Sequence, residues 1–228
     1  MFFDPSYLLL VFIPALILSL GAQFLVMSAF GKWSKVRNTA GLSGAQVAER
    51  IINRAGLNGV GLEGVPGQRT DHFDPRSNVV RMSQDVATKP SIASMAVVAH
   101  ELGHAQQHQE RSALIQMRNF LVPAMQISPQ IAMTLIFIGL FLRLTGALWL
   151  GIAFYGVVVV FMLLTLPVEF DASRRGLKLL QETGLMMSSE DVSGSRQVLT
   201  AAALTYVAAA ITAVLNLLYY ISIANRRR

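Results

Sequence analysis

Four long apolar runs constrain the fold of this chain more than any other feature of its sequence. They cover residues 7–29, 120–142, 146–167 and 198–224 and are nearly free of charge. A helix of about 20 apolar residues crosses the roughly 30 Å hydrocarbon core of a bilayer. With 53% hydrophobic and 14% charged residues, the composition also lies on the apolar side of ordinary soluble domains. The sequence therefore predicts an α-rich polytopic membrane protein with four transmembrane helices.

Basic residues beside these runs predict the orientation of the chain. They are Lys32, Lys35 and Arg37 after the first run, and Arg174, Arg175 and Lys178 after the third. Because positively charged loops stay in the cytoplasm, we expect the N-terminus outside and both of these segments inside. Asp4, rather than a basic segment, precedes the first run, which favours an uncleaved anchor over a secretory signal. Arg226, Arg227 and Arg228 argue against this orientation, since four crossings return the C-terminus to the outer side.

Charge and cysteine content limit the partners of the protein. The net charge of +6 is explained by the flanking basic residues, which favour the anionic headgroups of a lipid bilayer. No stripe of basic and aromatic residues indicates a nucleic-acid surface, so we expect no nucleic-acid partner. Because the chain has no cysteine, any metal must be held by imidazole and carboxylate groups.

The one sizeable polar region covers residues 31–119. Within it, Ser43 is expected to begin a capped amphipathic helix that Gly56 ends. Residues 59–67 and 78–83 alternate between apolar and polar side chains, which predicts two short strands joined by a turn. We expect a small α+β unit. Since the second strand ends just before the helix described next, its edge could pair with an extended substrate.

The strongest chemical signal is HELGH at residues 100–104, within a helix predicted over residues 91–109. His100 and His104 lie four residues apart, so both imidazoles project from one helix face and can take two corners of a zinc site. Glu101 then takes a proton from water as general base. A shuffled chain would contain this pattern roughly 0.002 times. The alternative is two histidines with a purely structural role.

A third protein ligand would leave one position of the zinc ion for water. The astacin-like arrangement would require a histidine at Glu110 and a glycine at Gln107, so we expect a carboxylate further along the chain. Glu169 is the best choice because an even number of crossings separates it from His100. Other acids on that side are Glu182, Glu190 and Asp191. Glu169 could instead cap the N-terminus of a following helix.

This assignment creates a geometric conflict. A straight helix that continues from His104 into the second run would hold His104 about 24 Å from the membrane, whereas Glu169 follows a run directly. Either the helix breaks, at Arg118 or Pro123, or the third membrane helix extends beyond the bilayer.

Two further histidines, His72 and His108, lie outside the HELGH motif. His72, in the predicted turn with Asp71 and Asp74, could donate to a developing oxyanion, or it could simply face solvent. His108 lies about 12 Å along the helix from His100, so one ion cannot reach both it and the motif.

Several segments resemble the bacterial YugP-like zinc-dependent membrane proteases, also described as neutral zinc metallopeptidases. They are SGAQVAERI, TDHFDP, SIASMAVVAHELGHAQQH and LPVEFDASRRGL, together with the opening anchor. The resemblance implies that Glu169, in LPVEFDAS, is the third zinc ligand. It also implies a location in the bacterial cytoplasmic membrane. HtpX-like and CAAX prenyl proteases have a similar Glu-Phe-x-Ala-Asp pattern, but here Ser173 replaces the final acid, so contacts behind the ligands are expected to differ.

The sequence thus predicts a zinc metalloendopeptidase with a gluzincin-like unit, which cleaves peptides or proteins, membrane proteins among them. An inactive zinc-stabilised scaffold that binds partners is the alternative, and the intact Glu101 counts against it. A transporter is disfavoured because Thr212 and Asn216 are neutral and can bond between helices. The expected parts are a membrane anchor (residues 1–30), the metalloprotease unit (31–119), a transmembrane hairpin (120–167), a segment with the third ligand (168–197) and a C-terminal transmembrane helix (198–228).

Overall fold

The computed structural model describes residues 4–226, so Arg227 and Arg228 of the C-terminal basic cluster lie outside the described residues. The chain divides into two units. The spanning unit comprises Met1–Ala22, Gln116–Pro167 and Thr205–Arg228, and the mixed unit comprises Gln23–Ile115 and Val168–Leu204. Each unit has its own hydrophobic core and is described separately.

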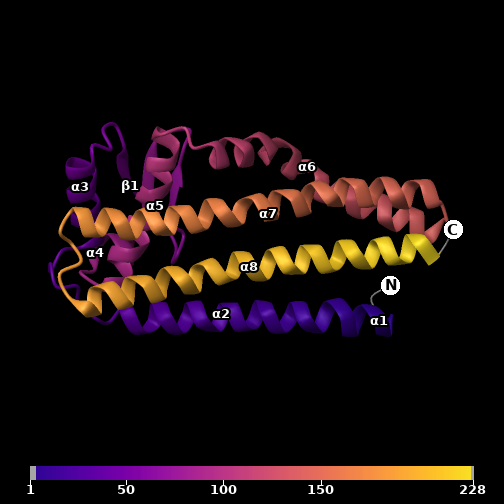
Figure 1. The fold of residues 1–228 in the computed structure, drawn as a ribbon, viewed down its shortest axis with the longest axis horizontal. Coiled ribbons are helices and arrows are strands. Elements are labelled where there is room, and N and C mark those ends of the chain that lie inside the picture. The colour runs from indigo at the N-terminus through magenta and orange to yellow at the C-terminus, as the bar shows by residue number, and fades with distance from the viewer. Residues whose placement is uncertain (1–3, 227–228) are drawn as a thin grey trace. The chain divides into compact units, whose positions relative to one another are not determined.

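Within residues 4–226, four helices are long and apolar enough to cross a membrane. They are Pro5–Trp33, Ala113–Phe141 (α6), Thr145–Glu182 (α7) and Ser189–Arg226 (α8). The first is a continuous stretch of α1 (Pro5–Tyr7), a π-helical segment η1 (Leu8–Phe12) and α2 (Ile13–Trp33), as Figure 1 shows. The predicted fold class, a mostly helical protein with four membrane helices and a small sheet, is confirmed.

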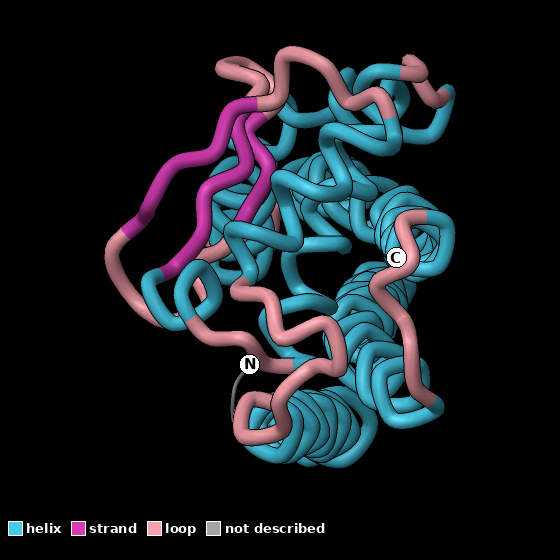
Figure 2. The backbone as a smooth tube through the Cα atoms, turned by 90° about the vertical axis from the view of Figure 1, so that its left-hand side faces the viewer, coloured by secondary structure: helices cyan, strands magenta, loops and turns pink. Residues whose placement is uncertain are grey.

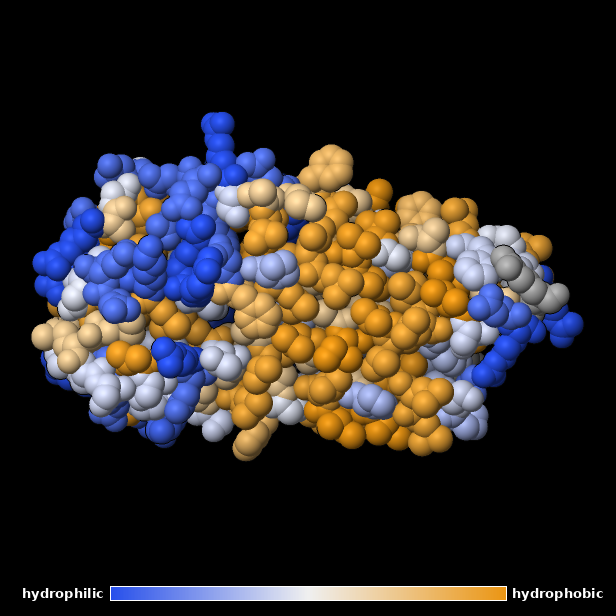
Figure 3. Space-filling view, viewed as in Figure 1, coloured by the Kyte–Doolittle hydropathy of each residue, from blue (hydrophilic) through white to orange (hydrophobic). Residues whose placement is uncertain are grey.

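The spanning unit is apolar inside and outside. Ile136 and Leu148 are buried in its core, whereas Phe120 and Phe141 are 82% and 86% exposed. Hydrophobic side chains cover most of the surface of this unit in Figure 3, as a lipid environment requires. Asn216 accepts a hydrogen bond from the Tyr7 hydroxyl (3.4 Å), which is the bond between membrane helices expected of this isolated polar residue.

In the mixed unit, the amphipathic helix predicted between Ser43 and Gly56 is present. Ser43 and Gln46 form a reciprocal capping box at the start of α3 (Gly44–Ala55). Gly56 ends the helix in the left-handed conformation, with φ of +68°. Val47 and Ile51, on its inner face, are fully buried at 0% exposure. The predicted amphipathic helix is confirmed.

The sheet differs from the prediction in one respect. Besides β1 (Gly61–Val65) and β3 (Val79–Ser83), the segment expected to be a turn contains a third strand, β2 (His72–Asp74). The order is β1-β3-β2, with β1 parallel and β2 antiparallel to β3, and the strands lie side by side in Figure 2. The expectation that the strand ending at Ser83 offers an edge is therefore wrong, because β3 is central. Three residues are too few for β2 to show an alternating pattern in the sequence.

The motif helix is α5 (Ile92–Gln109), which follows the short helix α4 (Gln84–Thr88). The Ser91 hydroxyl caps its first turn by accepting from the backbone N–H of Ser94 (3.1 Å). Met95, Val98 and Leu102 are fully buried in the core of the mixed unit. The predicted boundaries of this helix are confirmed within a residue.

The sequence placed His104 far from the membrane end of its helix and Glu169 next to it. Of the two ways to bring them together, a break after the motif helix and a longer third membrane helix, the structure has both. The motif helix ends at Gln109, and Arg111 has a φ of +51° before α6 begins at Ala113, so the break precedes Arg118 and Pro123. In turn, α7 continues without interruption through Pro167 to Glu182. Glu169 is therefore inside a helix, and the alternative that it caps a following helix is wrong.

Candidate metal centre

Two glycines let α5 and the second half of α7 approach closely. A Cβ atom on Gly103, the glycine of HELGH, would lie 2.3 Å from the carbonyl oxygen of Ala172. A Cβ atom on Gly176 would lie 2.7 Å from the carbonyl oxygen of Ala99. Real Cβ atoms do not come within 3.0 Å of such neighbours. Each helix thus presents a glycine to the backbone of the other.

This contact brings the three predicted ligands together. The imidazole rings of His100 and His104 lie 4.8 Å apart, centroid to centroid. Their Nε2 atoms are 3.3 Å and 3.5 Å, respectively, from Oε2 of Glu169. The donor atoms of the three residues all lie within 4.8 Å of one another. Among the described residues, this is the one group of three or more His, Asp or Glu side chains that could hold a metal ion.

The donor set fits zinc. Two atoms bound at 2.0–2.1 Å to a tetrahedral ion are about 3.3 Å apart, close to the two measured nitrogen–oxygen distances. Oε2 of Glu169 is buried and forms no hydrogen bond with any described residue. An unpartnered buried carboxylate oxygen is costly, and a cation would satisfy it.

Gln107 orients the imidazole of His104. Its amide nitrogen donates to the backbone carbonyl of Val168 (2.9 Å) and to Oδ2 of Asp171 (2.9 Å). Both partners are acceptors, which fixes the orientation of the amide. Its oxygen lies 3.0 Å from Nδ1 of His104 and must accept a hydrogen bond from the N–H there. The remaining nitrogen, Nε2, therefore keeps its lone pair and faces Glu169.

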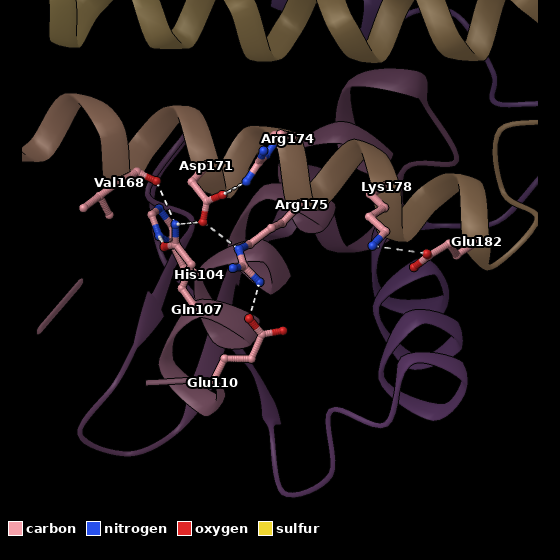
Figure 4. Close-up of polar contacts among 9 residues, drawn as sticks. All are labelled: His104, Gln107, Glu110, Val168, Asp171, Arg174, Arg175, Lys178 and Glu182. Carbon is pink, nitrogen blue, oxygen red and sulfur yellow. Dashed lines mark hydrogen bonds and ion pairs between the residues drawn. The ribbon is translucent and has the colours of Figure 1, made fainter. Parts of the chain in front are cut away.

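Charged residues extend this support, as Figure 4 shows. Asp171 accepts from Nε of Arg175 (2.6 Å) and also pairs with Arg174. Arg175 in turn pairs with Glu110 (2.7 Å), close to the end of α5. A continuous chain of polar contacts thus leads from Glu110 to the imidazole of His104. Sequence reasoning missed Gln107, although a spacing of three residues from His104 places both on one helix face.

The second imidazole has a different partner. The Ser173 hydroxyl lies 3.2 Å from Nδ1 of His100. Ser173 is the residue that replaces the acid of the related Glu-Phe-x-Ala-Asp pattern. A neutral hydroxyl can orient the ring as a carboxylate does, but it adds no negative charge behind it.

Glu101 is buried between the motif helix and the sheet. Its Oε2 accepts a hydrogen bond from the backbone N–H of Phe73 in β2 (2.9 Å). Burial raises the pKa of Glu101, against the opposing effect of the His100 and His104 rings. The carboxylate therefore lies beside the three-residue group without belonging to it.

The other predicted residues stay outside the group. His72 lies in β2 rather than in a turn, is exposed, and has Nδ1 2.8 Å from the carbonyl oxygen of Thr70. Asp71 accepts from the backbone N–H of Ser83 (2.7 Å) at the end of β3. His108 packs its ring against Phe73, with centroids 5.7 Å apart.

The other acids considered as ligands also have different positions. Glu182 pairs with Lys178 (3.6 Å). Asp191 is buried and accepts from the backbone N–H groups of Thr39 (3.1 Å) and Met187 (3.2 Å). Neither these acids nor Glu190 belongs to the group that could hold a metal.

Comparison with known proteins shows the family of this chain. The family model described as "Putative neutral zinc metallopeptidase" matches residues 8–225. The chain is 42% identical over 211 residues to the Bacillus subtilis (strain 168) protein named "Putative membrane protease YugP", a match that covers 92% of this chain and 93% of that protein. No solved structure was found to match the chain. Its sequence similarity and its four membrane-length helices identify the chain as a membrane protein that belongs to the neutral zinc metallopeptidase family.

Proposed function

We propose that this protein is a membrane-embedded zinc metalloendopeptidase in which His100, His104 and Glu169 hold the metal and Glu101 is the general base. The observation that carries the proposal is the convergence of two imidazole nitrogens on a buried carboxylate oxygen that has no other partner among the described residues. All three donors are less than one-sixth exposed, with side-chain values of 15%, 12% and 4%.

The residues around this group supply the remaining chemistry. When bound, zinc would provide the Lewis acidity that polarises a peptide carbonyl and makes a water molecule more acidic. Glu101 would take the proton of that water and later give it to the leaving amine. The burial that raises the pKa of Glu101 favours the first of these steps, because the carboxylate then takes up and holds the proton more readily. The N–H of Phe73 keeps one carboxylate oxygen in place.

We infer that His72 can assist only in its protonated form. Its Nδ1 lies 2.8 Å from a carbonyl oxygen, so a neutral ring uses its one N–H there. Only the imidazolium keeps a second N–H, on Nε2, for a developing oxyanion. A His72→Gln variant should keep its zinc and show a lower kcat. An unchanged kcat would leave His72 as a surface residue.

The edge strand suggests how a substrate would bind. With β3 in the centre, β2 is the edge strand whose Phe73 N–H reaches Glu101. An extended peptide that paired with β2 would pass the metal group with its backbone, which gives low side-chain selectivity. The proposed substrates are therefore extended segments of peptides or proteins, including membrane proteins.

Metal content and activity, measured together, test the assignment. Zinc per chain is determined by elemental analysis in wild type, Glu169→Ala and Glu101→Gln, and each is assayed against an unfolded model protein. We expect about one zinc per chain in wild type. We expect its loss in Glu169→Ala, and retained zinc without cleavage in Glu101→Gln. Full zinc and activity in Glu169→Ala would move the third ligand elsewhere. A wild-type protein that holds zinc but cleaves nothing would favour the alternative function, an inactive zinc-stabilised scaffold that binds partners.

We further propose that the metal group faces the cytoplasm of the bacterial cell. The absence of cysteine makes this directly testable, because a single introduced cysteine is the only thiol. Lys35→Cys should be protected from a membrane-impermeant maleimide added to intact spheroplasts, whereas Leu144→Cys, after the second membrane helix, should react. The reverse labelling pattern would invert the orientation.

A further inference from the structure

A groove in the mixed unit lies between α2 and the first half of α8, away from the residues of the metal group. Its volume is about 530 Å³, and only these two helices line it. They run in opposite directions along it, as Figure 1 shows. Nothing in the proposed peptidase chemistry uses this groove.

The groove changes from polar to apolar along its length. At one end Lys32 of α2 and Arg196 and Ser193 of α8 line it, and at the other Leu25 and Leu204 do. Seven residues separate the two ends on α2 (32 − 25) and eight on α8 (204 − 196), or roughly 10–12 Å of helix. Leu25 is 46% exposed and Leu204 38% exposed, although both point into a hollow. The two ends therefore suit a ligand with an anionic head and an apolar tail.

The polar end is held in shape by Trp33. Its indole N–H donates to Oε1 of Gln197 (2.9 Å), which also lines the groove. A Cβ atom on Gly194 would lie 2.7 Å from the indole ring, so this glycine lets the ring pack against α8. The Lys32 ammonium lies 4.3 Å from the centroid of the same ring. These contacts fix the spacing of the helices where the basic residues are.

Neither basic side chain has an acidic partner within residues 4–226. Among the ion pairs formed by described residues, none includes Lys32 or Arg196, although Lys89, Arg81 and Arg175 are all paired. Both side chains are exposed. Cations left unpaired above an apolar groove, on helices of membrane-spanning length, are complementary to a lipid phosphate.

We propose that this groove binds one anionic glycerophospholipid, with its phosphate between Lys32 and Arg196 and one acyl chain along Leu25 and Leu204. The groove has room for a headgroup and the beginning of a chain, and the rest of the lipid stays in the bilayer. Bound there, the lipid joins α2 to α8 and stabilises the mixed unit against their separation. This proposal does not depend on the peptidase function.

Lipid counting by native mass spectrometry tests the proposal. The whole protein in detergent is titrated with phosphatidylglycerol or with phosphatidylcholine of the same acyl chains, and bound lipid per chain is measured. We expect one phosphatidylglycerol to bind in preference to phosphatidylcholine. Lys32→Gln combined with Arg196→Gln should reduce its affinity about 30-fold, given the attraction of two basic residues to an anionic lipid.

Two further variants make the result specific. Lys35→Gln combined with Arg76→Gln removes the same charge outside the groove and should leave lipid binding unchanged. Thr200→Phe fills the exposed groove without changing its charge and should also weaken binding. Circular dichroism confirms that each variant is folded.

Three results would overturn the proposal. The first is equal loss of lipid in both charge variants, which would indicate diffuse surface attraction. The second is full lipid binding in both groove variants. The third is a wild-type dimer that becomes monomeric in the groove variants while lipid binding stays the same, which would assign the groove to a second copy of the chain.

Discussion

Replacing Gly103 by alanine should separate the two helices that carry the three proposed metal ligands. The added Cβ atom would lie 2.3 Å from the carbonyl oxygen of Ala172, and an ordinary contact begins at 3.4 Å. The helices must therefore move apart by about 1.1 Å at this point, whereas metal–ligand distances tolerate only about 0.2 Å. We expect zinc affinity to fall roughly 10–100-fold, as it does when the groups that support metal ligands are altered.

The effect on folding itself should be small. Alanine is favoured over glycine inside a helix by about 1 kcal/mol, which offsets part of the roughly 1–3 kcal/mol cost of overpacking. Zinc affinity, measured by competition with a chromophoric chelator, should therefore change much more than the melting temperature of the zinc-free protein. A large loss of stability without a loss of affinity would contradict this reasoning.

Two glycines of α7 provide a graded comparison with Gly103 of α5. At Gly176 the added Cβ would lie 2.7 Å from the carbonyl oxygen of Ala99, so a smaller shift of about 0.7 Å is needed. At Gly156 it would meet nothing within 4 Å. Loss of zinc affinity should decrease in the order Gly103→Ala, Gly176→Ala, Gly156→Ala, with no loss in the last. Unchanged affinity in Gly103→Ala, or a reversed order, would refute the close-approach argument.

Two more predictions concern side chains near the metal group. Gln107→Ala should weaken zinc binding about 10–100-fold, with activity recovered in excess zinc, while Gln109→Ala on the exposed face should match wild type; equal affinities would show that the amide does not orient the imidazole. The folded, metal-free protein holds the proton of Glu101 more tightly than the unfolded chain does, because burial raises its pKa above the ordinary 4.5. The free energy of unfolding of the metal-free protein should then fall as pH rises above 4.5. In the presence of a chelator, Glu101→Gln should therefore melt at a higher temperature than wild type at pH 7, by about 2–4 °C for each kcal/mol of unfolding free energy that wild type loses. The difference in melting temperature should shrink at pH 4. A difference that is independent of pH would contradict this account.

The fold features predicted from the sequence are those whose causes are local. Apolar runs of membrane length, and caps such as Ser43 and Gly56, act over a few residues, and the helices they predicted are present. The strand β2 was missed because three residues are too few to show the alternation of apolar and polar side chains that indicates a strand. Its position is set by pairing with β3, in which His72 lies opposite Arg81.

The candidate site was predictable only in part, for a similar reason. His100 and His104 are neighbours on one helix, so their spacing reveals their shared face. Glu169 was predicted from the number of membrane crossings between it and His100 and from the family resemblance. Because Pro167 precedes it by two residues, the sequence did not reveal that α7 continues through this segment without a break. The roles of Gly103 and Gln107 depend on the backbone of a helix distant in sequence, which no local pattern specifies.

The wide separation of the proposed metal ligands along the chain has a consequence for biosynthesis. Two donors are four residues apart, but Glu169 follows His104 by 65 residues (169 − 104). At a translation rate of about 5–20 residues per second, the third donor is made roughly 3–13 s after the second. Until α7 has been made and has packed against α5, the nascent chain has only two imidazoles, too few for tight zinc binding. If the three residues hold zinc as proposed, the order of synthesis would delay completion of the metal group until α7 is made, and the growing chain would stay inactive while its own unfolded segments are still exposed.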